Sequence, residues 1–305
     1  MGVLGRAVLA VGMRPKVQRM ITEGPGRRVA QRFVAGETLE DAIRTARRLN
    51  EEGFLVTLDA LGESVTDPRA MDQTAKLYLA TLDTIADAHL RSEISVKPTQ
   101  LGLLIDPERC RRHLELLVER ASEIGTTVTV DMEDRHATEH TMTLVCELSQ
   151  RFPGRVGVAL QAYLYRARED LRRLLEARVR VRLVKGAYRE PKAISLRSRE
   201  DISASFAALA TQLLGSTSYA MLATHDDHLI SLCEREIAAR NLAGETYEFQ
   251  MLFGVRRKLQ QQLLDRGHKV RIYVPFGDQW YPYLLRRLAE KPANLRFFVE
   301  ALVRG

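Results

Sequence analysis

One predicted helix near the carboxyl end of the chain carries side chains whose types and spacing suit the binding of a small anion. Four residues lie at i, i+3, i+4 and i+7 and therefore share one helix face: Tyr283, Arg286, Arg287 and Glu290. Each guanidinium presents a planar fork of N–H donors that matches the two oxygens of a carboxylate. The alternative is a solvated basic face. The aromatic residues that gather beside this pair, in a chain that is only 6% aromatic, favour a binding site.

A second set of polar residues follows predicted strands. If the strands are parallel and form a barrel, their carboxyl ends meet around one mouth, where reactive groups collect. The polar residues at or just past these ends are Asp59 with Glu63, Lys97, Asp131 with Glu133 and Asp134, Gln161 with Tyr163, Lys185 with Tyr188, Thr224 with His225 and Asp226, Gln250, and Tyr273. Together they predict a single polar pocket.

The elements that must position these groups alternate along the chain. Strand-like segments occupy residues 53–59, 93–97, 127–131, 156–162, 180–185, 219–224, 247–252 and 270–274. Helical patterns occupy 71–90, 107–124, 138–150, 166–177, 201–214, 227–240, 255–266 and 279–289. Strict alternation implies a parallel sheet, and eight units favour an α/β fold closed as a (β/α)8 TIM-like barrel. An open doubly wound sheet is the alternative, but no G-x-G-x-x-G follows any strand.

The domain organisation follows from the same alternation. Residues 1–50 are predicted to form an N-terminal helical arm, with its clearest helix at 39–51, and residues 51–305 to form the barrel domain. No run of 18 apolar residues is present, so no membrane span is predicted. Cys110, Cys146 and Cys233 each lie in a helical pattern, which is typical of reduced, buried residues of a cytoplasmic protein.

The net charge of +7 is concentrated at the amino end, where residues 1–35 hold seven basic groups and one acid. Such an arm could contact an anionic membrane surface or nucleic acid. The interpretation favoured here is that the arm packs on the barrel with its arginines in water. Peripheral membrane contact at the inner face of the cell membrane stays open as an alternative, and no nucleic-acid partner is predicted.

Other chemistries have weaker support. Two polar clusters contain residue types that bind metals: Asp131, Glu133, Asp134 and His136, and then His225, Asp226 and His228. Neither is accompanied by H-E-x-x-H or paired C-x-x-C, so no metal site is predicted. Lys185 could form a Schiff base in a lyase. The Gly186-Ala187 pair that follows it instead favours a strand end where a flat cofactor approaches the backbone.

Ordered motifs along the barrel region carry a family resemblance. They are DALGESV (59–65), SVKPTQLG (95–102), VDMED (130–134), LQAYLYR (160–166), VRLVKGAY (181–188), ATHD (223–226), YEFQMLFG (247–254), RIYVPFG (271–277) and YLLRRLAEKPAN (283–294). In this order they resemble the proline dehydrogenase family, whose members are flavoenzymes built on a (β/α)8 barrel. The resemblance spans about residues 53 to 298 and does not include the arm.

The resemblance implies FAD bound non-covalently at the carboxyl mouth of the barrel. The implied flavin contacts are Gln161, Arg182, Val184, Lys185, Gly186, Ala187, Thr224, His225 and Glu290, with Arg182 near the flavin N5. The implied substrate contacts are Lys97, Arg286 and Arg287 for the carboxylate, and Tyr188, Leu252, Tyr273 and Tyr283 around the ring. Glu63 and Arg286 form an implied gate, and the implied catalytic residues are Lys97, Asp131, Arg182 and Tyr273.

The implied reaction is the oxidation of L-proline to Δ1-pyrroline-5-carboxylate, the first step of proline catabolism. A hydride leaves C5 for flavin N5 once the ring nitrogen has lost a proton to Asp131, Lys97 or water, and the electrons pass to a quinone. The resemblance also implies a monofunctional enzyme, with a separate pyrroline-5-carboxylate dehydrogenase downstream. The alternatives are a flavin barrel of the methylenetetrahydrofolate reductase type, a Schiff-base lyase using Lys185, and a cofactor-free binding barrel.

Overall fold

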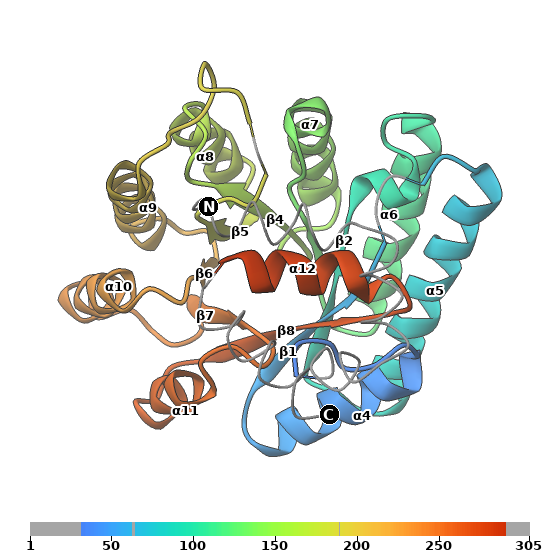
Figure 1. Ribbon diagram of the computed structural model, residues 1–305, viewed down its shortest axis with the longest axis horizontal. Coiled ribbons are helices and arrows are strands. Elements are labelled where there is room, and N and C mark those ends of the chain that lie inside the picture. Colours follow the sequence, from blue (N-terminus) through green and yellow to red (C-terminus); the bar gives the residue numbers. More distant parts are fainter. Residues whose placement is uncertain (1–31, 63–64, 189, 291–305) are drawn as a thin grey trace.

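The computed structural model describes residues 32–62, 65–188 and 190–290, the last five of these as helical backbone only. Eight parallel strands close into a barrel in which each strand pairs with the next and β8 pairs with β1 (Figure 1). The strands are β1 (Leu55–Ala60), β2 (Ser92–Val96), β3 (Val128–Val130), β4 (Val156–Gln161), β5 (Arg180–Val184), β6 (Ala220–Ala223), β7 (Tyr247–Leu252) and β8 (Val270–Phe276). The predicted (β/α)8 barrel is therefore confirmed.

A helix follows each strand, and all of these helices except the last cover the outside of the barrel (Figure 1). They are α5 (Pro68–Asp87), α6 (Pro107–Glu123), α7 (Arg135–Arg151), α8 (Ala167–Glu176), α9 (Arg199–Leu214), α10 (Asp227–Ala239), α11 (Arg257–Asp265) and α12 (Trp280–Glu290), with α4 (Leu39–Glu51) before β1. Every predicted strand and helix is present, and no end is displaced by more than three residues. A 3₁₀ turn, η1 (Pro98–Leu101), was not predicted.

Side-chain caps explain where most of these helices begin. Asp67 and Asp106 accept backbone N–H groups at the starts of α5 and α6, and each is followed by a proline at the first helical position. Asp134, Ser198 and Asp226 cap α7, α9 and α10 in the same way. The acidic clusters after β3 and β6 thus include helix caps.

The last helix does not take the usual place of the eighth barrel helix. β8 ends at Phe276 and α12 begins at Trp280, a link of the same length as the one between β6 and α10. In Figure 1, α12 instead lies across the barrel at the carboxyl ends of the strands, and α4 fills the position between α11 and α5 in the outer ring. The predicted anion-binding stripe is therefore on the helix that covers the mouth.

Helix α4 is tied to the barrel through its apolar face. Ala42, Ala46 and Leu49 are buried within the main hydrophobic core, and α4 packs against β1 and β8. The division of the chain at residue 50 into an arm and a barrel domain stays a prediction. Residues 1–31, which carry most of the predicted basic arm, lie outside the described residues.

Strand β8 extends past the predicted end at Val274. Pro275 pairs with Asp59 of β1, whereas pairing with β7 stops at Tyr273. The carbonyl of Pro275 accepts from Ala35 N, so this peptide faces away from β1. Proline is tolerated at this position because a backbone N–H here would point toward β7, and β7 no longer pairs with β8 at this point.

The three cysteines are free and lie on helices, as predicted. Cys110 and Cys233 are buried, whereas Cys146 is only partly buried, so the prediction of burial was wrong for Cys146. Within the described part of the chain, no helix has both the length and the apolar character that a bilayer span requires.

Candidate active site at the mouth of the barrel

The interior of the barrel is unusually polar, and its side chains come from alternate strand positions. In SEISV-K, residues Glu93, Ser95 and Lys97 alternate with the apolar Ile94 and Val96. Because successive strand side chains point to opposite faces, the apolar set packs under the helices and the polar set enters the barrel. The inward polar set includes Thr57, Asp59, Glu93, Ser95, Lys97, Thr129, Asp131, Arg182, Glu248, Gln250, Arg271 and Tyr273.

Lys97 is held by two carboxylates at the mouth. Its Nζ donates to both oxygens of Asp59, at 2.7 and 2.9 Å, and lies 3.5 Å from Oδ2 of Asp131. Burial alone would lower the pKa of Lys97, but the two carboxylates outweigh burial and raise the pKa above its ordinary value. Lys97 is therefore a fixed positive charge at the carboxyl end of β2.

Asp131 lies where three predicted catalytic residues meet. Its Oδ1 accepts from Arg182 Nη1 at 2.8 Å, and its Oδ2 accepts from the Tyr273 hydroxyl at 2.7 Å. Burial opposes ionisation of this carboxyl, but Lys97 and Arg182 overcome it and lower the pKa of Asp131. Asp131 is therefore a carboxylate near neutral pH.

Tyr273 joins this group through both its hydroxyl and its ring. Burial, together with the negative charge of Asp131, raises the pKa of Tyr273 well above its usual value. The phenol therefore stays protonated and donates a hydrogen bond to Asp131. The Arg182 guanidinium lies 5.3 Å from the centre of the Tyr273 ring, within the range of a cation–π contact. The four predicted catalytic residues, Lys97, Asp131, Arg182 and Tyr273, thus form one cluster in the structure.

The ends of β4 and β5 expose backbone beside this cluster. Gly186 has φ of +118°, and a Cβ there would lie 2.1 Å from the Tyr163 ring, so only glycine fits. Gln161 holds the segment, because its Nε2 donates to Glu133 O at 3.0 Å and its Oε1 accepts from Ala187 N at 3.4 Å. Gly186 and Ala187 are exposed and Val184 is half-buried, which leaves an open surface at the mouth.

Lys185 is engaged in an ion pair. Its Nζ donates to Asp226 Oδ2 at 2.8 Å and to Ser203 Oγ at 3.0 Å. Asp226 also caps α10, so it anchors Lys185 to the start of that helix. This pairing is unlike the desolvated, isolated lysine that Schiff-base chemistry needs.

The neighbouring strand ends contribute the remaining predicted contacts. Thr224 is buried, and its Oγ1 accepts from Asp226 N at 3.2 Å. His225 Nε2 accepts from Leu252 N at 3.0 Å, so the neutral ring carries its proton on Nδ1. Leu252 and Tyr188 are half-buried and Tyr283 is 6% exposed.

Four predicted site residues cannot be placed beside the others. Glu63 lies outside the described residues. Arg286, Arg287 and Glu290 belong to α12, but their side chains lie outside the described part of the structure. The backbone of α12 nonetheless places all three on the helix that covers the mouth (Figure 1).

The structure does not gather metal ligands at the two clusters considered from sequence. Asp134 and Asp226 accept backbone N–H groups from His136 and His228, as helix caps do. Glu133 is occupied by Thr99, whose N and Oγ1 donate to it at 2.9 and 2.6 Å. Among the residues that the structure describes, no three His, Cys, Asp or Glu side chains converge on a possible metal position.

Several polar contacts of the cluster were not predicted as site residues. Asp59 and Gln250 belong to the polar strand ends, but neither was given a role. Ser95 and Glu93 were missed entirely, although both contact Arg182. The two-residue alternation in SEISVK was the signal for them, since polar residues at every second position of a fully covered strand must face the barrel interior.

Comparisons with known proteins agree with this architecture. A family model described as proline dehydrogenase matches residues 42–300. Proline dehydrogenase 1 of Bacillus subtilis strain 168 is 37% identical over 275 residues, which are 90% of this chain and 91% of that protein. The proline dehydrogenase of Deinococcus radiodurans is 34% identical and covers 98% of each chain.

A solved structure shares the fold at lower identity. Proline utilization A from Bdellovibrio bacteriovorus, inactivated by N-propargylglycine, superposes with a TM-score of 0.81 at 24% identity, over 87% of this chain and 32% of that one. The family match covers most of the barrel, and the two relatives cover nearly the whole chain. The chain therefore belongs to the proline dehydrogenase family.

Proposed function

We propose that this protein oxidises L-proline to Δ1-pyrroline-5-carboxylate with bound FAD. The observation that carries the proposal is the buried cluster of Lys97, Asp131, Arg182 and Tyr273 beneath α12, the helix that bears the paired arginines. This arrangement provides fixed positive charge, an ionised carboxylate and an aromatic wall at one mouth. The names of the relatives in B. subtilis and D. radiodurans support the same substrate.

The residues at the mouth fit a flavin. Gly186 and Ala187 present exposed backbone without bulky side chains, just past the end of the strand that carries Arg182, and this suits the approach of a flat ring system. The residues that would hold the cofactor are Gln161, Arg182, Val184, Lys185, Gly186, Ala187, Thr224, His225 and Glu290. When bound, the flavin supplies an acceptor at N5 for the hydride that leaves C5 of proline.

The chain's own residues bind and orient the substrate. Lys97 remains charged in its ion pair and, with Arg286 and Arg287, would hold the proline carboxylate. Tyr188, Leu252, Tyr273 and Tyr283 would wall the pyrrolidine ring. A fixed carboxylate and a walled ring make hydride loss a positioned, effectively unimolecular event. Glu63 with Arg286 would close the site and exclude water.

The ring nitrogen must lose a proton, because an ammonium has no lone pair to drive hydride loss from the adjacent carbon. Lys97 is already protonated, which argues against it as the acceptor. Asp131 is ionised and can take the proton directly or through a water. Loss of this proton and of the hydride from C5 converts the ammonium to a protonated imine, which releases its remaining N–H proton to water to give the imine of the product.

The test is a spectrum of the purified protein before and after substrate. Bound flavin should absorb at about 450 nm, and L-proline should bleach this band under anaerobic conditions. A colourless protein that cannot be loaded with FAD would overturn the proposal. Bleaching by NAD(P)H but not by L-proline would favour a reductase of the methylenetetrahydrofolate type.

We further propose that a membrane quinone reoxidises the flavin and that the basic segment of residues 1–31 contacts the anionic inner face of the membrane. That segment holds six of the seven basic groups within residues 1–35, and basic segments bind anionic lipid. Replacing the six with glutamine should weaken sedimentation with anionic vesicles. This change spares Phe33 and Val34, which are buried against the fold. Unchanged vesicle binding would remove the membrane role without affecting the proline chemistry.

A further inference from the structure

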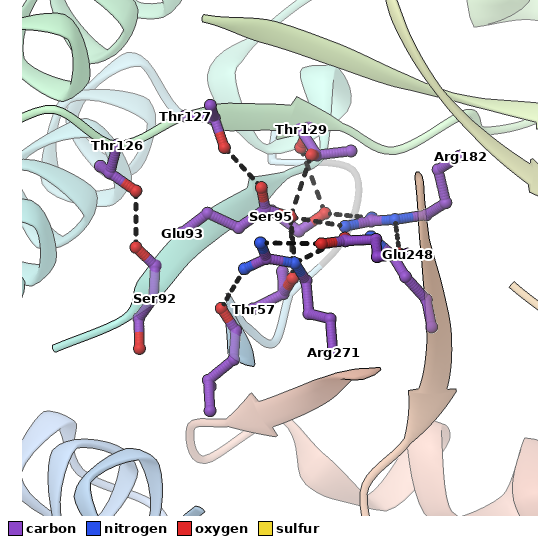
Figure 2. Close-up of polar contacts among 12 residues, drawn as sticks. Thr57, Ser92, Glu93, Ser95, Thr126, Thr127, Thr129, Arg182, Glu248 and Arg271 are labelled. Atoms are coloured by element: carbon purple, nitrogen blue, oxygen red, sulfur yellow. Dashed lines mark hydrogen bonds and ion pairs between the residues drawn. The ribbon is translucent and has the colours of Figure 1, made fainter. Parts of the chain in front are cut away.

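A closed ring of charged and amide side chains lies one layer below the candidate active site. We name it the interior ring; its members are Glu93, Arg182, Glu248, Gln250 and Arg271. Figure 2 shows Glu93, Arg182, Glu248 and Arg271 inside the barrel, and every ring member is fully or almost fully buried. Glu248 and Arg271 precede the strand-end residues Gln250 and Tyr273 by two positions, and Glu93 precedes Lys97 by four, so these three lie nearer the amino ends of the strands.

The ring closes through five contacts from four strands. Arg182 Nε donates to Gln250 Oε1 at 2.6 Å, and Gln250 Nε2 donates to Glu248 Oε1 at 2.6 Å. Glu248 accepts from Arg271 at 2.7 and 3.1 Å. Arg271 Nε lies 3.8 Å from Glu93 Oε1, and Arg182 Nη2 returns to the same oxygen at 3.3 Å. Strands β2, β5, β7 and β8 are thereby joined across the interior.

Arg182 belongs both to the ring and to the active-site cluster described above. Its Nη1 donates to Ser95 Oγ at 2.7 Å and to Asp131 Oδ1 at 2.8 Å. With the contacts to Gln250 and Glu93, four of its five N–H groups have acceptors among the described residues. The position and the effective charge of this guanidinium therefore depend on the ring below it.

Glu93 is built to remain charged. Thr57 and Thr129 donate to its Oε1 at 2.8 and 3.1 Å, and Thr127 donates to its Oε2 at 2.5 Å (Figure 2). Burial would raise the pKa of Glu93, but Arg271 and Arg182 with these hydroxyls lower it to about 2. Three threonines from two neighbouring strands are thus used to orient one carboxylate at 1% exposure.

The ring holds two arginines and two glutamates, so its formal charges cancel. Loss of one carboxylate would leave a buried excess of one positive charge in contact with Arg182. In a low-dielectric interior such a charge acts over several ångströms. A flavin beside Arg182 gains negative charge on reduction, so its reduced form would be favoured by that excess.

We propose that Glu93 is a positioning residue that orients Arg182 and offsets its charge, and thereby sets the reduction potential of the bound flavin. This inference rests on the proposed function, because it requires a flavin next to Arg182. Glu93 contacts Arg182 directly, and its other partners are the three threonines and Arg271. Its influence passes through the guanidinium.

The test compares the flavin midpoint potential of the holoprotein in wild type and Glu93→Gln, which removes the charge and keeps the shape. We expect the variant to favour reduced over oxidised flavin by about tenfold, which is about 30 mV for a two-electron couple. The rate of anaerobic flavin reduction should change, whereas the KM for L-proline should stay within about twofold. Glu93→Asp retains the charge and should return the potential toward the wild-type value.

The matched control is Asp170→Asn on α8. Asp170 is also a buried carboxylate held by an arginine, with Arg166 Nε at 2.7 Å, but it lies in the outer helix layer. Its loss should lower stability and leave the flavin potential unchanged. A Glu93→Gln potential equal to that of wild type, or a shift of the same size in Asp170→Asn, would overturn the proposal.

A second variant covers the case in which Glu93→Gln does not fold. Thr127→Val leaves Glu93 ionised but removes a hydroxyl dipole that offsets its negative charge, so it should shift the potential in the opposite direction, toward oxidised flavin, by about twofold in the same ratio. A folded Thr127→Val with the wild-type potential would refute the role of Glu93. Failure of wild type itself to bind flavin or to be reduced by L-proline would instead refute the proposed function, and this inference with it.

Discussion

Lys97 and Asp59 form a buried ion pair in which one ammonium donates to both carboxylate oxygens, at 2.7 and 2.9 Å. Asp59 is 1% exposed and Lys97 7% exposed, so neither charge is compensated by bulk water. The pair joins the ends of β1 and β2 and turns the Lys97 ammonium toward Asp131. A residue predicted to bind substrate is therefore held in place by an acid that was given no role.

Asp59→Asn should be strongly destabilising, because it leaves Lys97 buried with only the more distant Asp131. Breaking one side of a buried pair costs about 3–5 kcal/mol. Urea unfolding at neutral pH should show a loss of that size in the free energy of unfolding. Asp83→Asn is the control, since Asp83 pairs with Arg120 at the surface and should change stability by less than about 1 kcal/mol. Equal, small effects in both variants would contradict this account of Lys97.

Tyr273→Phe should move the acid limb of the pH profile. The Tyr273 hydroxyl donates to Asp131 at 2.7 Å and stabilises its ionised form, so removing it raises the pKa of Asp131. If ionised Asp131 is required, kcat/KM should then fall at a higher pH than in wild type as the solution is acidified. Tyr247→Phe, whose hydroxyl contacts His268 instead, should leave the limb in place. An unmoved limb in Tyr273→Phe would exclude Asp131 as the titrating group.

The order of strands and helices could be predicted because each strand carries apolar residues in a run or at every second position, and each helix has its own period. Asp106-Pro107 illustrates this, since it marks the start of α6 within a few letters of sequence. The polar strand ends also led correctly to one mouth, because parallel strands must end together. Local pattern was sufficient for these features.

The contacts between strands could not be predicted in the same way. That Arg182 on β5 would contact Glu93 on β2, 89 positions away, depends on barrel closure and side-chain length. Likewise, no local signal distinguishes a helix that returns outside the barrel from one that covers the mouth. The outer position that α12 would take is filled by α4, which precedes β1 in the chain (Figure 1).

Arg287→Ala should weaken proline binding. Tyr283 is buried at the mouth, and Arg287 lies four residues on, hence on the same helix face. Loss of a charge-assisted carboxylate contact of about 3 kcal/mol should raise the KM for L-proline on the order of 10²-fold. Arg240→Ala, which removes an exposed pair with Glu236 after α10, should leave the KM unchanged. A wild-type KM for L-proline in Arg287→Ala would mean that Arg287 does not hold the proline carboxylate.

Gly186→Ala should impair flavin binding more than its backbone strain alone explains. The residue has φ of +118°, and an added Cβ would overlap the Tyr163 ring. Gly125→Ala is the matched control, because Gly125 has φ of +77° with no atom within 4 Å of the added Cβ. Both variants should lose about 1 kcal/mol to strain, but only Gly186→Ala should show reduced flavin content after purification and dialysis. Full flavin occupancy in Gly186→Ala would show that this backbone does not contact the cofactor.

Glu93 should also govern stability in acid. Its pKa is about 2 in the folded protein against an ordinary 4.5, so its ionised form stabilises the fold fully above about pH 4.5, and this contribution is lost as the pH falls toward 2. The difference corresponds to about 3 kcal/mol at 1.36 kcal/mol per pKa unit.

Protonated Glu93 resembles glutamine in shape and charge. The gap between the unfolding free energies of wild type and Glu93→Gln should therefore be largest above pH 5 and should shrink toward pH 2. Urea titrations of both proteins across this range measure the gap directly, because titration of all other carboxylates is common to the two. A gap that stays constant with pH would mean that Glu93 is protonated in the folded barrel, and would remove the charge on which its role beneath Arg182 depends.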